Sequence, residues 1–157
     1  MQTAPVRVLL VEDDEDDYIL TRDVLDSIEQ RQHEIVWCQT FGKALNLLAE
    51  QSFDVALIDY RIGQETGIEL LKLAKASGHD LPMILLTGLD DRDIDVTASE
   101  AGAFDYIVKD ELTPTRAERT IRFACAFAAT RRSLIKRTEG LQAALDNVAG
   151  RGLVLKI

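Results

Sequence analysis

The chain has 157 residues, which suffices for one ordinary domain with a buried core plus a short appendage. Its composition, 46% apolar and 29% charged, is that of a soluble globular protein, and no apolar run approaches the ~20 residues of a membrane span. The net charge of −9 is uneven: residues 1–113 hold 24 acidic and 9 basic side chains, and residues 114–157 hold 3 acidic and 9 basic. Because residues 1–113 are so acidic, they should repel nucleic acid and attract cations or basic partner surfaces.

The N-terminus and the cysteines predict a cytoplasmic protein. Residues 1–5 contain no basic region followed by an apolar one, so we expect no secretory signal and no membrane association. Cys38 and Cys125 lack metal-type spacing and a CxxC pair, which indicates free thiols in a reducing compartment. The basic residues after 114 would suit a nucleic-acid-binding arm. They alternate with apolar residues at helical spacing, however, which favours a solvated helix face and no direct nucleic acid binding.

Short apolar runs alternate with longer segments of helical period, the pattern of a βαβ fold with a parallel sheet. The five predicted strands are about Val6–Val11, Glu34–Cys38, Val55–Ile58, Met83–Leu86 and Asp105–Val108. In the second strand Ile35 and Trp37 share one face, which is typical of a sheet edge. The third strand is apolar throughout, as a central strand covered on both faces should be.

A helix is predicted after each strand. The first carries the apolar residues Tyr18, Ile19, Val24, Leu25 and Ile28. Thr40 can cap the second helix, and Thr66 with Glu69 forms a capping box that opens a third helix to about Ser77, after a loop of Gly63, Gln64 and Glu65. A polar stretch with Asp90, Asp91, Asp93 and Asp95 leads into a fourth helix ending near Gly102. Pro114 begins an unusually long fifth helix.

Four of the predicted strands are each followed by a polar group of a different chemical type. An acidic cluster, Glu12-Asp13-Asp14, follows the first strand, Asp59 follows the third, Thr87 the fourth and Lys109 the fifth. Because the carboxyl ends of strands in an open parallel sheet share one rim, where ligands bind, these groups should converge on one site.

Glu12, Asp13 and Asp59 on one rim would bring like charges within a few Å of each other. Such a cluster raises at least one pKa or requires a counter-ion. A hard divalent cation with oxygen ligands, Mg²⁺ above all and Mn²⁺ as an alternative, resolves the repulsion, and Lys109 adds a second positive charge. The alternative is that the cluster only favours a helix N-terminus through the macrodipole, which is the role we assign to Asp14, Glu15 and Asp16.

Asp59 has a less ordinary environment, because a carboxylate directly after a buried strand costs desolvation free energy unless charge or metal compensates it. Carboxylates also act as covalent phosphoryl acceptors. A metal, an ammonium and a hydroxyl donor stabilise the charge that builds on the phosphoryl oxygens during transfer. Thr87 and Lys109 are each unremarkable alone, but together with the acidic cluster they are specific, and Gly88 leaves room for a phosphoryl group.

The order Glu12-Asp13, Asp59, Thr87, Lys109 resembles the receiver domain of two-component response regulators, over about residues 5–125. Gly67 and the run Gly102-Ala103-Phe104-Asp105-Tyr106 extend the resemblance. It implies a doubly wound α/β fold of flavodoxin type, with a five-stranded parallel sheet in the order 2-1-3-4-5.

The resemblance also implies roles for individual residues. Glu12 and Asp13 would bind Mg²⁺ together with Asp59 and the backbone carbonyl of Arg61. Asp59 would accept a phosphoryl group from a histidine kinase or histidine phosphotransfer protein, and Thr87 and Lys109 would contact it. Thr87 and Tyr106 would form the switch, although Tyr106 also suits an ordinary half-buried strand aromatic. The chain would then be a signal receiver rather than an enzyme.

Three positions depart from the family pattern. Asp110 follows Lys109 where the family usually has proline, which disfavours a cis bond there because a non-proline cis bond costs ~2.5–4 kcal/mol. Gly63 also stands in place of a usual proline, so a looser loop is expected. Arg61 is long and cationic near the phosphoryl oxygens, and should alter the lifetime of the phosphate.

Residues 126–157 are expected to form an extended helix or linker after a receiver domain of residues 1–125, leading to an output domain outside this sequence. A heptad seam runs along it, with imperfections at Arg131 and Thr138 and a weak point at Gly140: Ala124, Phe127, Arg131, Leu134, Thr138, Leu141, Leu145 and Val148. The seam predicts a parallel homodimer that relays the signalling state. The alternative is an amphipathic tail packed on its own domain. Residues 141–155 resemble the entry to a PAS sensory domain.

Two other classes of protein compete with this interpretation. A phosphohydrolase of the haloacid dehalogenase type needs a second Asp two residues after its nucleophile, where this chain has Arg61. A phosphate-independent pseudo-receiver would not need the acidic pair, Asp59, Thr87 and Lys109 all to be present. No helix-turn-helix module fits in the tail, which disfavours DNA binding by these residues.

Overall fold

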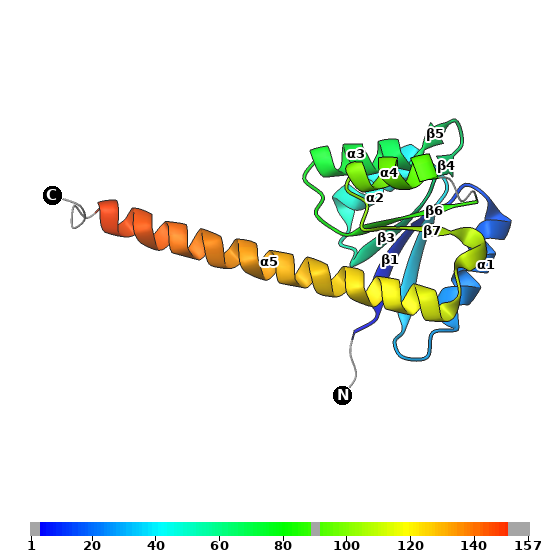
Figure 1. Cartoon of the computed structure of the whole chain (residues 1–157), viewed down its shortest axis with the longest axis horizontal. Coiled ribbons are helices and arrows are strands. Elements are labelled where there is room, and N and C mark those ends of the chain that lie inside the picture. The colour runs from blue at the N-terminus through cyan, green and yellow to red at the C-terminus, as the bar shows by residue number, and fades with distance from the viewer. Residues whose placement is uncertain (1–3, 89–91, 151–157) are drawn as a thin grey trace. The chain divides into compact units, whose positions relative to one another are not determined.

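A computed structural model describes residues 4–88 and 92–150 of the chain, and Figure 1 shows their path. Among these residues, no helix combines the length and the apolar character needed to cross a membrane. Asp90, Asp91 and the last part of the PAS-like segment lie outside the described residues.

Five parallel strands form the central sheet in the order β2-β1-β3-β6-β7, which confirms the predicted fold class and strand order. Their bounds are β1 Val6–Val11, β2 His33–Cys38, β3 Val55–Asp59, β6 Met83–Thr87 and β7 Asp105–Val108. The predicted strands agree closely with these, except that Asp59 and Thr87 are the last residues of β3 and β6 rather than the first residues beyond them.

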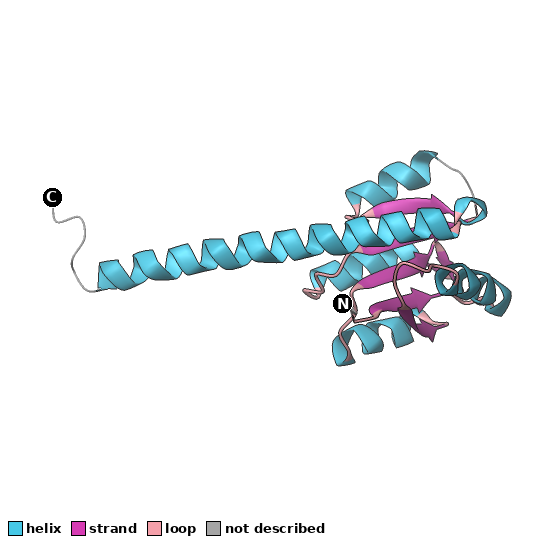
Figure 2. Ribbon diagram, turned by 90° about the horizontal axis from the view of Figure 1, so that it is seen from below, coloured by secondary structure: helices cyan, strands magenta, loops and turns pink. Residues whose placement is uncertain are grey.

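Helices cover both faces of the sheet (Figure 2). They are α1 Glu15–Asp26, α2 Phe41–Glu50, α3 Gly67–Ala76, α4 Arg92–Glu100 and α5 Pro114–Gly150. Alternate side chains of β1 serve the two faces: Leu9 packs with residues of α2, α3 and α4, and Leu10 packs with residues of α1 and α5. Both leucines are fully buried, and each such burial is worth ~1.5–3 kcal/mol. This two-sided core holds the strand ends in place.

Side-chain caps begin three of the helices. Asp14, Thr40 and Thr66 each accept a hydrogen bond from the backbone N–H three residues ahead, at 3.0, 3.2 and 3.3 Å. These bonds satisfy N–H groups that have no partner inside the helix. They confirm the predicted capping roles of Thr40 and Thr66, and they fix where the chain turns from the sheet rim into each helix.

A short hairpin and a short 3₁₀ helix near the rim were not predicted. The expected loop after β3 contains a hairpin of β4 Arg61–Ile62 and β5 Glu65–Thr66, which turns at Gly63 with a φ of 62°. Two-residue strands are too short to show any periodicity, so the sequence pattern could not reveal them. After β7 the chain makes a short 3₁₀ helix, η1 Lys109–Glu111, and the Lys109–Asp110 peptide bond is trans.

The chain divides into two compact units, Met1–Cys125 and Ala126–Ile157. In the first unit, Ala117, Ile121 and Ala124 of α5 are buried in the core. In the second unit α5 continues to Gly150 without interruption at Gly140. The apolar residues that it exposes, each by between 37 and 65%, are Phe127, Leu134, Ile135, Leu141, Leu145 and Val148.

Candidate functional site

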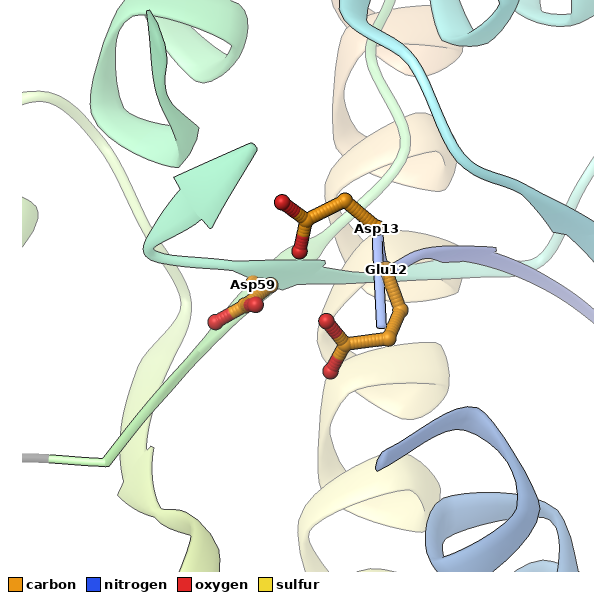
Figure 3. Close-up of side chains that lie close together, drawn as sticks. All are labelled: Glu12, Asp13 and Asp59. Carbon is orange, nitrogen blue, oxygen red and sulfur yellow. The ribbon is translucent and has the colours of Figure 1, made fainter. Parts of the chain in front are cut away.

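Three carboxylates meet at the carboxyl ends of β1 and β3. Glu12 and Asp13 directly follow β1 and Asp59 ends β3, and parallel pairing of Val11 with Ile58 brings them to one level of the sheet. One oxygen of each carboxylate lies within 4.8 Å of the others (Figure 3). Glu12 and Asp59 are buried, with 1% and 7% exposure, whereas Asp13 is exposed. The predicted convergence of these residues is therefore present.

Glu12 is buried in contact with both Asp59 and Lys109. Burial, followed by its contact with Asp59, raises the pKa of the Glu12 carboxyl to about 8, although Lys109 acts in the opposite direction. The backbone carbonyl of Glu12 accepts a hydrogen bond of 2.8 Å from Nε1 of Trp37, whose ring stacks on Tyr18 at 4.0 Å. Trp37 is thereby linked directly to the acidic cluster.

Lys109, the first residue after β7, brings the positive charge. Its Nζ lies 2.8 Å from Oε1 of Glu12 and 3.3 Å from Oδ2 of Asp59. A third carboxylate, Asp17 of α1, accepts a hydrogen bond of 2.7 Å from the same Nζ. Burial opposes the charge on Lys109, but the hydrogen bonds to Asp17 and Glu12 outweigh it and raise the pKa of the ammonium. Asp17 was not predicted as a site residue, because it reads as one more acid in the first turn of a helix.

Asp13 is connected to the hairpin that follows Asp59. Its Oδ2 accepts a hydrogen bond of 2.9 Å from the backbone N–H of Gly63. A proline at this position would have no N–H to donate. The segment after Asp59 is thus paired internally and bonded to the acidic cluster, and the looser loop expected from Gly63 stays a prediction.

The remaining predicted residues lie on adjoining segments. Thr87 is buried at the end of β6, directly after Leu86, which pairs with Asp59 across the sheet. Tyr106 is half-buried in β7 and packs on the core beneath α2, α3 and α4. Arg61 is exposed in β4, with its guanidinium 5.9 Å from the centre of the Tyr60 ring. Thr87 thus shares the rim with Asp59, and the Arg61 side chain lies over a neighbouring aromatic ring.

The donor set fits a hard divalent cation. Glu12, Asp13 and Asp59 offer carboxylate oxygens, the ligands that Mg²⁺ prefers, and no soft nitrogen or sulfur ligand belongs to the cluster. Two of the three are buried side by side, an arrangement that favours a bound positive charge.

A cavity of about 420 Å³ adjoins the site on the side of α1. Its lining includes Lys109, Asp17 and Gly88 together with apolar side chains of α1 and of the segment after η1; the full set is Asp17, Leu20, Thr21, Val24, Gly88, Lys109, Asp110 and Leu112. Lys109 and Asp17 therefore border this cavity.

Two related proteins each match two thirds or more of the chain. Response regulator MprA of Mycolicibacterium vanbaalenii is 30% identical over 105 residues, 67% of this chain and 44% of its own length. The alginate biosynthesis transcriptional regulatory protein AlgB of Pseudomonas aeruginosa is 28% identical over 93% of this chain and 30% of its own length. The chain thus spans less than half the length of these curated relatives. Because AlgB is named a transcriptional regulatory protein, the expectation of no nucleic acid binding finds no support here.

Solved structures and a family model agree with these relatives. The crystal structure of a CheY-like response regulator receiver domain protein from Methanospirillum hungatei matches 82% of this chain and 99% of its own, with 25% identity and a TM-score of 0.71. No comparison supports the likeness of residues 141–155 to a PAS domain, and α5 occupies that segment up to Gly150. The model of the response regulator receiver domain matches residues 8–120, and the chain belongs to that family.

Proposed function

We propose that the chain is a phosphorylation-dependent signal receiver whose Asp59 accepts a phosphoryl group from a histidine kinase or histidine phosphotransfer protein. One observation carries the proposal: Asp59 Oδ2 lies 3.3 Å from Lys109 Nζ, and the Asp59 carboxylate belongs to a cluster with Glu12 and Asp13. A nucleophilic carboxylate thus lies beside the Lys109 ammonium and beside carboxylates that could bind a metal ion.

The transfer forms a bond between a carboxylate oxygen of Asp59 and phosphorus. The phosphorus–nitrogen bond of the donor phosphohistidine breaks, and its electron pair leaves with the imidazole. Lys109 and the Thr87 hydroxyl would donate hydrogen bonds to the phosphoryl oxygens, where charge accumulates. Held by Glu12, Asp13, Asp59 and the Arg61 carbonyl, Mg²⁺ would supply further positive charge against those oxygens.

The chain acts on no separate substrate in this proposal, because it catalyses only its own modification. Thr87 and Tyr106 would sense the phosphoryl group and pass the state to α5. The exposed apolar residues of α5 would then associate with those of a second copy, so that the output is a homodimer.

Treatment with acetyl phosphate and Mg²⁺ tests the acceptor directly. Intact mass spectrometry should detect one added phosphoryl group that is lost in acid, and Asp59→Asn should abolish the addition. The matched control is Asp16→Asn, an exposed carboxylate of α1, which should label like the wild type. Equal labelling of the Asp59→Asn variant would reject Asp59 as the acceptor.

A further inference from the structure

Lys109 has three carboxylate partners among the described residues, and the shortest contact is to the one from α1. Its Nζ lies 2.7 Å from Asp17, 2.8 Å from Glu12 and 3.3 Å from Asp59. Glu12 and Asp59 belong to the acidic cluster, whereas Asp17 lies in a helix and is 92 residues from Lys109 in sequence. This pairing requires an explanation beyond charge balance within the cluster.

An ammonium group carries three N–H donors on a flexible stem, so its direction depends on its partners. Two of the three donors bond to Asp17 and Glu12. The ion pair with Asp59 then uses the direction that remains, toward the acceptor oxygen. The two shorter contacts therefore aim the ammonium at the carboxylate that would be phosphorylated.

A cation bound in the acidic cluster would change which carboxylates hold Lys109. Glu12 would then direct its oxygens to the ion, which weakens its hold on Lys109. Asp17 is not part of the cluster and keeps its lone pairs for the ammonium. Its own position is set by α1, where its backbone N–H donates to the cap residue Asp14 at 3.0 Å.

We infer that Asp17 is a positioning residue that holds the Lys109 ammonium facing Asp59 during phosphoryl transfer. This inference rests on the proposed function, and it adds to the site a residue from α1. The Asp17 side chain is 38% exposed, so its effect should be modest and should weaken with added salt.

The kinetic test compares Asp17→Asn with the wild type and with Asp16→Asn, the neighbouring exposed carboxylate. At saturating Mg²⁺ and acetyl phosphate, Asp17→Asn should slow phosphorylation about two- to fivefold, the range for a partly exposed ion pair, with little change in Mg²⁺ affinity. Asp16→Asn should match the wild type in both. An Asp17→Asn variant that reacts as fast as the wild type, or faster, overturns the inference.

A second readout does not depend on phosphorylation. With Mg²⁺ bound, the rate at which an amine-reactive reagent modifies Lys109 should rise about two- to fivefold in Asp17→Asn and stay unchanged in Asp16→Asn. An unchanged rate in Asp17→Asn overturns the inference even if the wild type is phosphorylated normally. A raised rate in a protein whose wild type accepts no phosphoryl group supports the anchoring of Lys109 and rejects the proposed function instead.

Discussion

The backbone N–H of Gly63 donates a hydrogen bond of 2.9 Å to Oδ2 of Asp13, which ties the hairpin after Asp59 to the acidic cluster. The hairpin also carries Arg61, whose carbonyl is expected to face the cation. One backbone donor would therefore link the conformation of the hairpin to any metal bound by Asp13. The same glycine has a φ of 62°, a region that L residues with side chains rarely adopt.

Substitutions of Gly63 should separate the effect of its backbone N–H donor from the effect of its positive φ. Gly63→Asn keeps the N–H and tolerates positive φ, so its Mg²⁺ affinity should stay close to that of the wild type. Gly63→Pro removes the donor and cannot adopt the backbone angle, and it should weaken Mg²⁺ binding several-fold. Calorimetric titration with Mg²⁺ measures both variants. Equal affinities would mean that the Asp13–Gly63 bond does not orient the metal ligand.

Magnesium binding should release a proton from Glu12. Burial raises the pKa of this carboxyl to about 8, so it is largely protonated at neutral pH without the ion. The folded chain then binds more protons than the unfolded one, and this group makes the free energy of unfolding fall as pH rises from about 4.5 to about 8.

A cation needs the carboxylate, so Mg²⁺ affinity should rise with pH between 6 and 8, by at most about tenfold per unit from this one proton. Calorimetry in two buffers of different ionisation enthalpy counts the protons released. Glu12→Gln, which cannot ionise, is the control and should flatten the dependence. A wild-type profile as flat as that of the variant contradicts a protonated Glu12.

Asp13 and Asp14 should differ in their effect on Mg²⁺ binding although they are neighbours. Asp13→Asn removes an anionic ligand and should weaken binding strongly. Asp14 caps α1 through Asp17 N–H at 3.0 Å, and asparagine caps equally well, so Asp14→Asn should change little. Trp37 fluorescence is a suitable signal, because its Nε1 bonds to the carbonyl of Glu12. Similar losses in both variants would show that the ligands are assigned to the wrong residues.

Gly67 is needed because of the space around it. An added Cβ would overlap with the backbone oxygen of Asp59 and lie 2.9 Å from side-chain atoms of Ile58 and Leu85. Gly67→Ala should therefore destabilise the fold by ~1–3 kcal/mol, the usual cost of overpacking. Gly42 of α2 has no atom within 4 Å of such a Cβ, so Gly42→Ala should stabilise by up to ~1 kcal/mol. Urea unfolding of both variants tests the contrast, which fails if Gly67→Ala is neutral.

Association through α5 should be weak because of Arg131. In a parallel homodimer the seam would bring two copies of this residue together, whereas Leu134, Leu141 and Leu145 would be buried. Arg131→Leu should therefore tighten the dimer, and Leu141→Ser should loosen it. Sedimentation of these variants beside a chain ending near Arg131 measures the effect. Monomers throughout at tens of micromolar, phosphorylated or not, would exclude dimerisation by this segment.

Sequence reasoning succeeded where one local pattern determines one feature. Apolar runs identified all five strands of the main sheet, and the polar residues at their ends identified Asp59, Lys109 and the acidic pair as neighbours. Asp17 was missed because nothing local distinguishes it from Asp16, and only the fold, which brings α1 to the residue after β7, reveals its partner. The Gly63 donor was missed for a similar reason, since a backbone N–H has no sequence signature.

The residues of the site are far apart in sequence, and this has a consequence for folding during synthesis. Lys109 bonds to Glu12 across 97 residues, and it follows the last strand of the sheet to be synthesised. Contacts so distant in sequence form late, after loop-closure entropy has been overcome. A nascent or partly unfolded chain that lacks β7 at the edge of the sheet therefore has Asp59, the proposed acceptor, but not its ammonium partner. Such a chain should be a poor phosphoryl acceptor, so incompletely folded copies would compete little for the signal.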